Sequence, residues 1–199
     1  MNNGNQRDKT RRTTGLAIFT ALIIVIQIIC TFVRFGPFSI TLALAPIIIG
    51  AAMYGRKAGA YLGLVFGLVV LVTGIMGWDG GVVMLLMSQS AIGCILLCLV
   101  KGVAAGWLAG LIYDALSKKN ELAAVITAGV VCPVANTGLF IVGMLVFFLQ
   151  TLESWASGQA MLYYLIFGLT GINFVIELAV NLVLASGITR IIHAGKNMR

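Results

Sequence analysis

"NQRDKTRRTTGLAIFTALIIVIQ", residues 5–27, joins a basic segment directly to a long apolar one. An α-helix needs about 20 apolar residues to cross the hydrocarbon core of a bilayer. Across the whole chain of 199 residues, 60% are hydrophobic, only 10% are charged, and the mean hydropathy is +1.07. A soluble domain cannot cover that much apolar surface with so little charge. The sequence therefore predicts an integral membrane protein.

Six apolar stretches predict an all-α, compact bundle of about six transmembrane helices. We expect residues 1–13 to form a basic N-terminal segment, residues 14–193 the membrane domain and residues 194–199 a tail. One stretch, residues 82–115, is too long for a single crossing and too short for two. We therefore expect residues 84–100 to form an apolar external loop or a short helix that caps a cavity. The six stretches cover about residues 14–33, 38–54, 58–76, 82–115, 122–149 and 163–192.

The basic residues predict the orientation of this bundle. With six crossings, eleven of the 13 Lys and Arg residues fall on one side of the membrane. Loops rich in Lys and Arg stay on the cytoplasmic side, so we expect both termini in the cytoplasm of a multi-pass plasma-membrane protein. This distribution explains the net charge of +7 without a nucleic-acid partner. The eleven residues are Arg7, Lys9, Arg11, Arg12, Arg56, Lys57, Lys118, Lys119, Arg190, Lys196 and Arg199.

Polar residues within the apolar stretches predict a pocket open to the outside. A polar group in hydrocarbon is costly, so each one needs a partner or a role. Asn173, Glu177 and Asn181 recur every four residues and share one helix face. The two basic residues outside the cytoplasmic set, Arg34 and Lys101, would attract an anionic group. With Gln27 as a further polar residue nearby, the expected substrate-binding residues are Arg34, Trp78, Gln89, Lys101, Asn136, Thr137, Asn173 and Glu177.

The polar residues could instead have structural roles and bind no ligand. A pair formed by Lys101 and Glu177 could hold helices together, and asparagines could bridge helices. Two glycine stripes, 59/63/67 and 102/106/110, have the spacing of smooth helix faces that let backbones approach closely. We expect these two stripes to serve packing within the chain.

Metal and enzyme chemistry find little support in the sequence. The four cysteines lie in apolar stretches without a C-x-x-C pair, and the one histidine is His193. We therefore expect no metal site and no cofactor. The chain also has no H-E-x-x-H motif and no glycine-rich phosphate loop. A binding or transport protein is favoured over an enzyme, with any ATP hydrolysis carried out by partner subunits.

Three stretches resemble the substrate-binding S component of energy-coupling factor (ECF) vitamin transporters. "AIFTA", residues 17–21, resembles the A-x-x-x-A signature of the family's first helix. "ITLALAPIIIGAAMYGRKAGAYLGLVFG", residues 40–67, resembles the region of helices two and three. The family often has Gly-Pro-Lys-Ala-Gly there, and this chain has Arg56 in the proline position. "KGVAAGWLAGLIY", residues 101–113, resembles the start of the fourth helix.

The resemblance implies a function and a set of partners. An S component binds a vitamin tightly from outside, under its first loop and the loop after helix three. It then docks through helix one on a transmembrane coupling subunit, which two ATP-binding-cassette ATPases drive, and it releases the vitamin inside. Ala17 and Ala21 would form the partner interface, and the glycine stripes of the first three spans would extend this sliding surface.

The basic residues of the pocket indicate the class of substrate. Lys101 and Arg34 favour a ligand with a carboxylate, and the modest number of aromatic residues argues against a large flat ring. Pantothenate fits both points, while riboflavin, folate and lipoate stay open. The alternative function is a stand-alone, ion-coupled secondary transporter that uses Glu177 and Lys101 as a relay.

Overall fold

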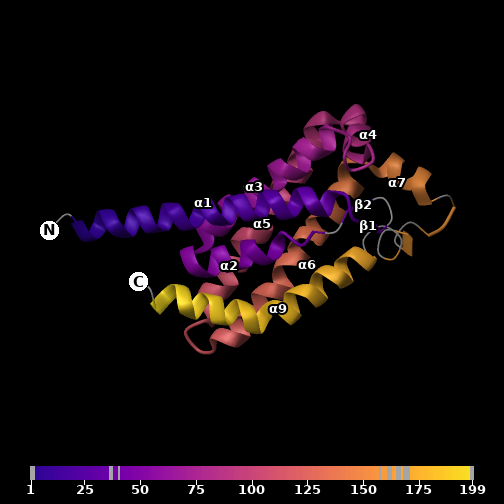
Figure 1. The fold of residues 1–199 in the computed structure, drawn as a ribbon. Helices are drawn as coiled ribbons and strands as arrows, with labels where there is room; N and C mark the ends of the chain where they lie inside the picture. The colour runs from indigo at the N-terminus through magenta and orange to yellow at the C-terminus, as the bar shows by residue number, and fades with distance from the viewer. Residues whose placement is uncertain are drawn as a thin grey trace.

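The computed structural model describes residues 3–35, 38–39, 41–156, 158–160, 163–164, 167 and 171–197. The described part is almost entirely helical, as expected (Figure 1). A two-stranded antiparallel ribbon that the sequence analysis does not anticipate pairs β1 (Arg34–Phe35) with β2 (Phe38–Ser39). The helices are α1 (Asn3–Thr31), α2 (Leu44–Tyr54), α3 (Arg56–Ile75), α4 (Val82–Gln89), α5 (Ala91–Leu116), α6 (Glu121–Phe147), α7 (Leu149–Ala156) and α9 (Ile172–Asn197).

Four of the described helices are long and apolar enough to cross a membrane. They are α1 from Lys9 onward, α3, α5 and α6. Two shorter apolar helices, α2 and the part of α9 from Asn173 to Ala185, accompany them. The described residues thus account for four long spans, and the full set of six crossings stays a prediction.

Two helix boundaries differ from the expected ones. Helix α1 begins at Asn3, so the basic segment is helical and continuous with the first apolar stretch. The stretch 82–115 divides at Ser90, whose backbone is extended with φ −153° and ψ 96°. The Ser90 hydroxyl accepts a hydrogen bond from the Gly93 N–H at 3.2 Å and so caps the start of α5. The expected short capping helix is therefore α4 alone, and residues 91–100 belong to α5.

The two glycine stripes pack against each other. A Cβ atom placed on Gly63 would lie 2.0 Å from the Gly102 carbonyl oxygen, and one on Gly59 would lie 2.2 Å from that of Gly106. Only glycine permits such an approach of α3 and α5, and the expected packing role within the chain is confirmed. The expectation that the glycines of α3 extend a sliding surface for a partner is wrong, because that stripe is covered by α5.

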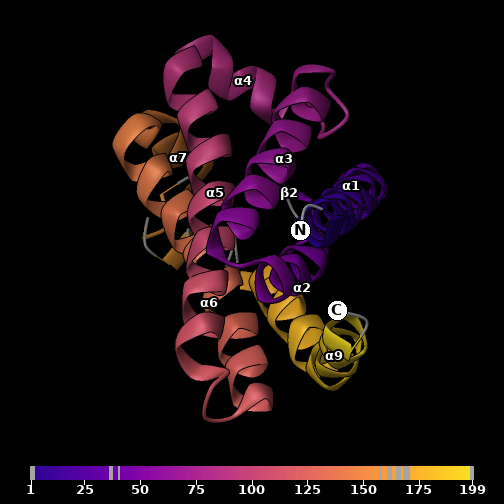
Figure 2. The same cartoon turned by 90° about the vertical axis from the view of Figure 1, so that its left-hand side faces the viewer.

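The two ends of the bundle differ in charge and in architecture. Figure 1 shows both chain termini and the α5–α6 connection at one end, and α4, α7, β1 and β2 at the other. Figure 2 shows α1 and α9 on one side of the bundle, with α5 and α6 on the other. Basic residues gather at the end with the termini. There the Arg12 guanidinium donates to the Tyr54 carbonyl at 3.1 Å, and the backbone of Arg56 lies against Gly110.

Among the described residues, the apolar core forms two clusters, one toward each end. The first surrounds α2 and includes Ile47, Leu62 and Phe66. The second lies where α4 and α7 meet α5 and α6, and includes Leu86 and Met144. The polar residues of α5, α6 and α9 lie between these two clusters, which is where the cavity forms.

Candidate functional site

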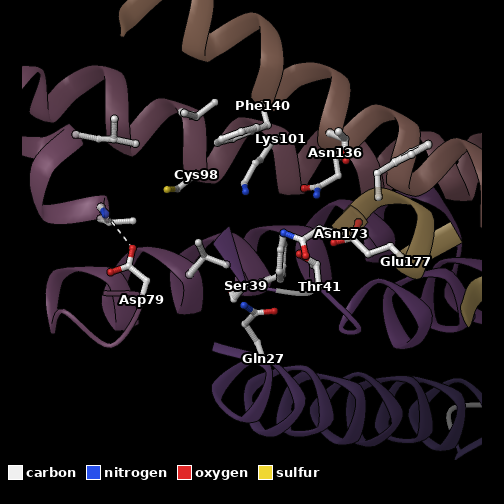
Figure 3. Close-up of a pocket in the computed structure, with 17 residues that line it drawn as sticks. Gln27, Ser39, Thr41, Asp79, Cys98, Lys101, Asn136, Phe140, Asn173 and Glu177 are labelled. Atoms are coloured by element: carbon white, nitrogen blue, oxygen red, sulfur yellow. Dashed lines mark hydrogen bonds between the residues drawn. The ribbon is translucent and has the colours of Figure 1, made fainter. Parts of the chain in front are cut away.

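A cavity lies between the two apolar clusters, and polar side chains from four helices, from β2 and from two connecting segments line it (Figure 3). It offers about 100 Å³ to the centres of water-sized molecules, which is room for several waters or a small organic ligand. Phe66 from the first cluster and Phe140 from the second form apolar parts of its wall. The polar and charged residues that line it are Gln27, Ser39, Thr41, Asp79, Lys101, Asn136, Thr137, Asn173 and Glu177.

Lys101 brings a positive charge into this cavity. It projects from the middle of α5, and its Nζ lies 5.3 Å from the ring centroid of Phe140 and 5.9 Å from that of Phe66. Ring faces attract a cation, but they do not accept its N–H groups as an oxygen would. The charge of Lys101 also interacts with that of Glu177. The ammonium is thus held in place while it remains able to bind an anionic oxygen.

Glu177 places a buried carboxyl group on the α9 wall. It is 4% exposed, and Asn173 and Asn181 on the same helix face are 7% and 3% exposed. Thr41 lies beside the Glu177 carboxylate and interacts with it through both its side chain and its backbone. Within the described part of the chain, Oε2 of Glu177 has no hydrogen-bond partner. The predicted polar face of α9 is confirmed, although Asn181 packs near Gly129 of α6 and does not line the cavity.

Asp79 is a cavity residue that the sequence analysis did not select. Its Oδ1 accepts from the Gly81 N–H at 2.9 Å and its Oδ2 from the Val83 N–H at 2.8 Å. The carboxylate therefore holds the first turn of α4, whose Val83 and Leu86 line the cavity; Figure 3 marks one of these bonds. The available signal was a single acidic residue within the glycine-rich segment "GWDGG", where Gly80 and Gly81 have positive φ. Ser39, Thr41 and Cys98 also line the cavity without having been predicted.

The predicted binding residues divide into three groups. Five of them line the cavity, and two lie elsewhere. Gln89 is exposed and accepts a hydrogen bond from Thr151, which links α4 to α7. Trp78 is 40% exposed, and its ring centroid lies 5.8 Å from that of Phe32. The backbone of Arg34 pairs with Ser39, a cavity residue, and its side chain lies outside the described part of the structure. The five residues in the cavity are Lys101, Asn136, Thr137, Asn173 and Glu177.

The predicted partner residues lie on the open face of α1. Ala17 and Ala21 are exposed, and only 17% of the apolar part of this helix is buried within the chain. Large apolar side chains such as Ile18 and Val25 are more than half exposed beside them. This face of α1 is therefore free to contact lipid or another protein. Within the described residues, no cluster of three His, Cys, Asp or Glu side chains could hold a metal ion.

Comparison with known proteins identifies the family. A family model described as the substrate-specific component of ECF transporters matches residues 11–189. The chain belongs to this family. This match confirms the resemblance seen in the sequence. Members of the family are the substrate-binding components of transporters and not enzymes.

Two known proteins are similar to this S component over nearly its whole length. The pantothenic acid transporter PanT of Lactococcus lactis subsp. cremoris is 26% identical over 202 residues, covering 96% of this chain and 98% of PanT. The structure of ThiT from Listeria monocytogenes matches with a TM-score of 0.62 at 20% identity, covering 93% of this chain and 98% of ThiT. The second match shows that the two proteins share a fold.

Proposed function

We propose that this S component captures pantothenate outside the cell with high affinity. In this proposal, a coupling subunit in the membrane and two ATP-binding-cassette ATPases then drive delivery of the vitamin to the inside. Family membership and the similarity to PanT support uptake of a vitamin. The observation that carries the choice of ligand is the ammonium of Lys101, which reaches into the cavity against two aromatic rings.

The ammonium of Lys101 favours a ligand that carries a carboxylate. Both oxygens of Asp79 accept backbone N–H groups of the chain, and Glu177 is the other carboxylate among the described residues that line the cavity, with a charge that interacts with that of Lys101. Burying a cation is costly unless an opposite charge or several acceptors balance it. A ligand carboxylate would supply that balance through a short, charge-assisted bond. Pantothenate also carries an apolar dimethyl group that suits the rings of Phe66 and Phe140.

The proposed topology follows from the distribution of basic residues. We assign the end with both termini to the cytoplasm, because basic segments collect there and such segments stay inside. The end with α4 and α7 then faces the outside, where the vitamin enters. With α2 and α9 as the two shorter crossings, the chain spans the plasma membrane six times.

Ligand binding by the Lys101→Met variant tests the proposed substrate. Wild type and variant are purified in detergent and titrated with pantothenate and with pantothenol, in which an alcohol replaces the carboxylate. A bond to a charged group contributes about 1.5–3 kcal/mol, so the variant should lose about 10- to 100-fold in affinity for pantothenate. Its affinity for pantothenol should change little. Lys57→Met, which removes the same charge from an exposed position on α3, serves as the control.

Two results would contradict this substrate assignment. Equal losses for pantothenate and pantothenol would show that Lys101 acts on the fold and not on the carboxylate. If wild type fails to bind pantothenate and binds riboflavin, folate or lipoate instead, the assigned substrate is wrong and the proposed transport role stands.

Bulky substitutions on α1 test the proposed partner interface. We expect Ala17→Leu combined with Ala21→Leu to abolish uptake in cells while the purified protein binds pantothenate normally, because leucine side chains would keep the coupling subunit at a distance. Ala179→Leu, at an exposed alanine of α9, is the matched control. Uptake by the purified chain alone in proteoliposomes, driven by an ion gradient, would instead favour the stand-alone transporter with Glu177 and Lys101 as its relay.

A further inference from the structure

Three buried oxygen atoms without a hydrogen-bond partner line the same cavity. They are Oε1 of Gln27, Oδ1 of Asn136 and Oε2 of Glu177, for which no donor lies within the described residues. Their side chains are 2%, 5% and 4% exposed. We call these three atoms the acceptor cluster. Native proteins leave few buried acceptors without a donor, and each such exception needs an explanation.

The acceptor cluster lies on different walls from the cation. Gln27 projects from α1, Asn136 from α6 and Glu177 from α9, whereas Lys101 projects from α5. Figure 3 shows Gln27 on the α1 side of the cavity and Lys101 on the α5 side, with Asn136 and Glu177 farther along toward α9. A molecule in the cavity therefore meets a positive charge on one wall and acceptor oxygens on the others.

We propose that the acceptor cluster binds the hydroxyl and N–H donors of the ligand, and that Gln27 determines specificity for the hydroxylated end. The inference rests on the proposed function and assigns an orientation to the ligand. The carboxylate lies at Lys101, and the hydroxyls lie toward Gln27 and Glu177. Water satisfies these oxygens in an empty cavity. A ligand with donors at the matching positions replaces that water, whereas an apolar analogue leaves the oxygens buried and unbonded.

Gln27 is the member of the cluster that gives the cleanest test. It belongs to α1, the peripheral helix, and its Oε1 makes no bond within the described residues that a substitution would break. Gln27→Leu removes the acceptor and keeps a side chain of similar size. Gln27→Asn keeps an amide and shortens the side chain, which moves the acceptor away from the ligand. Thr31→Val is the matched control, because Thr31 is a buried polar residue one turn further along α1 that donates to the Gln27 backbone carbonyl at 2.8 Å.

The experiment measures the affinity of each purified variant for pantothenate and for its dideoxy analogue, in which hydrogen replaces both hydroxyls. We expect wild type to bind pantothenate about 10-fold or more tightly than the dideoxy analogue. The analogue has no hydroxyls and so cannot form the hydrogen bonds to the polar and charged acceptors. Gln27→Leu and Gln27→Asn should reduce this preference about 10-fold by weakening pantothenate binding alone. Thr31→Val should keep the wild-type preference for pantothenate. Lys101→Met should weaken the binding of both ligands, because both carry the carboxylate.

The outcomes separate this inference from the proposed function. If wild type binds neither ligand, pantothenate is not the substrate and the inference falls with it. If wild type binds pantothenate but the Gln27 variants lose both ligands equally, or lose neither, the orientation is wrong while the proposed function stands. Size-exclusion profiles of the variants, and retained binding of the dideoxy analogue, show that the variants are folded.

Discussion

The close backbone contact between Gly63 of α3 and Gly102 of α5 gives a prediction whose size follows from the structure. In the Gly63→Ala variant, the new Cβ atom would lie 2.0 Å from the Gly102 carbonyl oxygen and 2.6 Å from its carbon. Ordinary van der Waals contact begins near 3.4 Å. Because the obstacle is backbone, no change of rotamer relieves the clash. Helices α3 and α5 must therefore move apart along this contact.

The expected cost combines two opposing terms. Overpacking a close contact costs about 1–3 kcal/mol, with a rigid backbone obstacle at the upper end. Replacing glycine by alanine within a helix returns about 1 kcal/mol. The net loss of about 2 kcal/mol corresponds to a decrease in Tm of about 4–8 °C for a protein of this size. Ligand affinity should fall as well, because Phe66 lies one turn from Gly63 and its ring flanks Lys101 at 5.9 Å.

Thermal unfolding of the detergent-purified protein, followed by tryptophan fluorescence, measures this effect. Gly138→Ala is the control, because a Cβ atom on Gly138 of α6 meets nothing within 4 Å. The control should unfold at the wild-type temperature or slightly above it. If Gly63→Ala unfolds at the same temperature as Gly138→Ala, the glycines of α3 and α5 do not make the contact described here, and the reasoning fails.

Two further substitutions test how α4 is held over the cavity. Asp79→Ala removes the acceptor for the Gly81 and Val83 N–H groups, and pantothenate release in a chase experiment should become several-fold faster with little change in Tm. An unchanged release rate would show that this carboxylate does not position α4. Thr151→Val removes the hydrogen bond to Gln89, and we expect faster amide hydrogen exchange in both α4 and α7, by about fivefold for a bond contributing about 1 kcal/mol. Identical exchange in wild type and variant would mean that this bond does not join the two helices.

The long helices could be predicted from the sequence because the features that indicate them are local. The expected stretch 58–76 is observed as Arg56–Ile75, and the stretch 122–149 as Glu121–Phe147. Length, hydropathy and flanking charges are properties of each segment alone, and the bilayer imposes the same requirement on every span. The break at Ser90 was anticipated only as an irregularity of length, because its position depends on a capping bond.

The cavity could be predicted only in part. Lys101, Asn136 and Glu177 stood out because a polar residue in an apolar stretch is conspicuous, and all three line the cavity. Asp79 comes from a connecting segment, where polar residues are common and carry no such signal. Thr41 lies within the expected stretch 38–54, and only the structure places it in the segment before α2. Gln89 lies within the apolar stretch 82–115 as well, yet it bonds to Thr151 of α7 and lies outside the cavity.

The sequence by itself determined that this is a membrane protein of the S-component family, with smooth glycine faces and buried polar groups on its helices. Only the tertiary structure decided how those faces meet: Gly63 packs on Gly102, and Gln27 of α1 reaches the same cavity as Glu177 of α9. The physical reason is that helical periodicity depends on neighbouring residues, whereas the pairing of faces depends on packing among segments far apart in the chain.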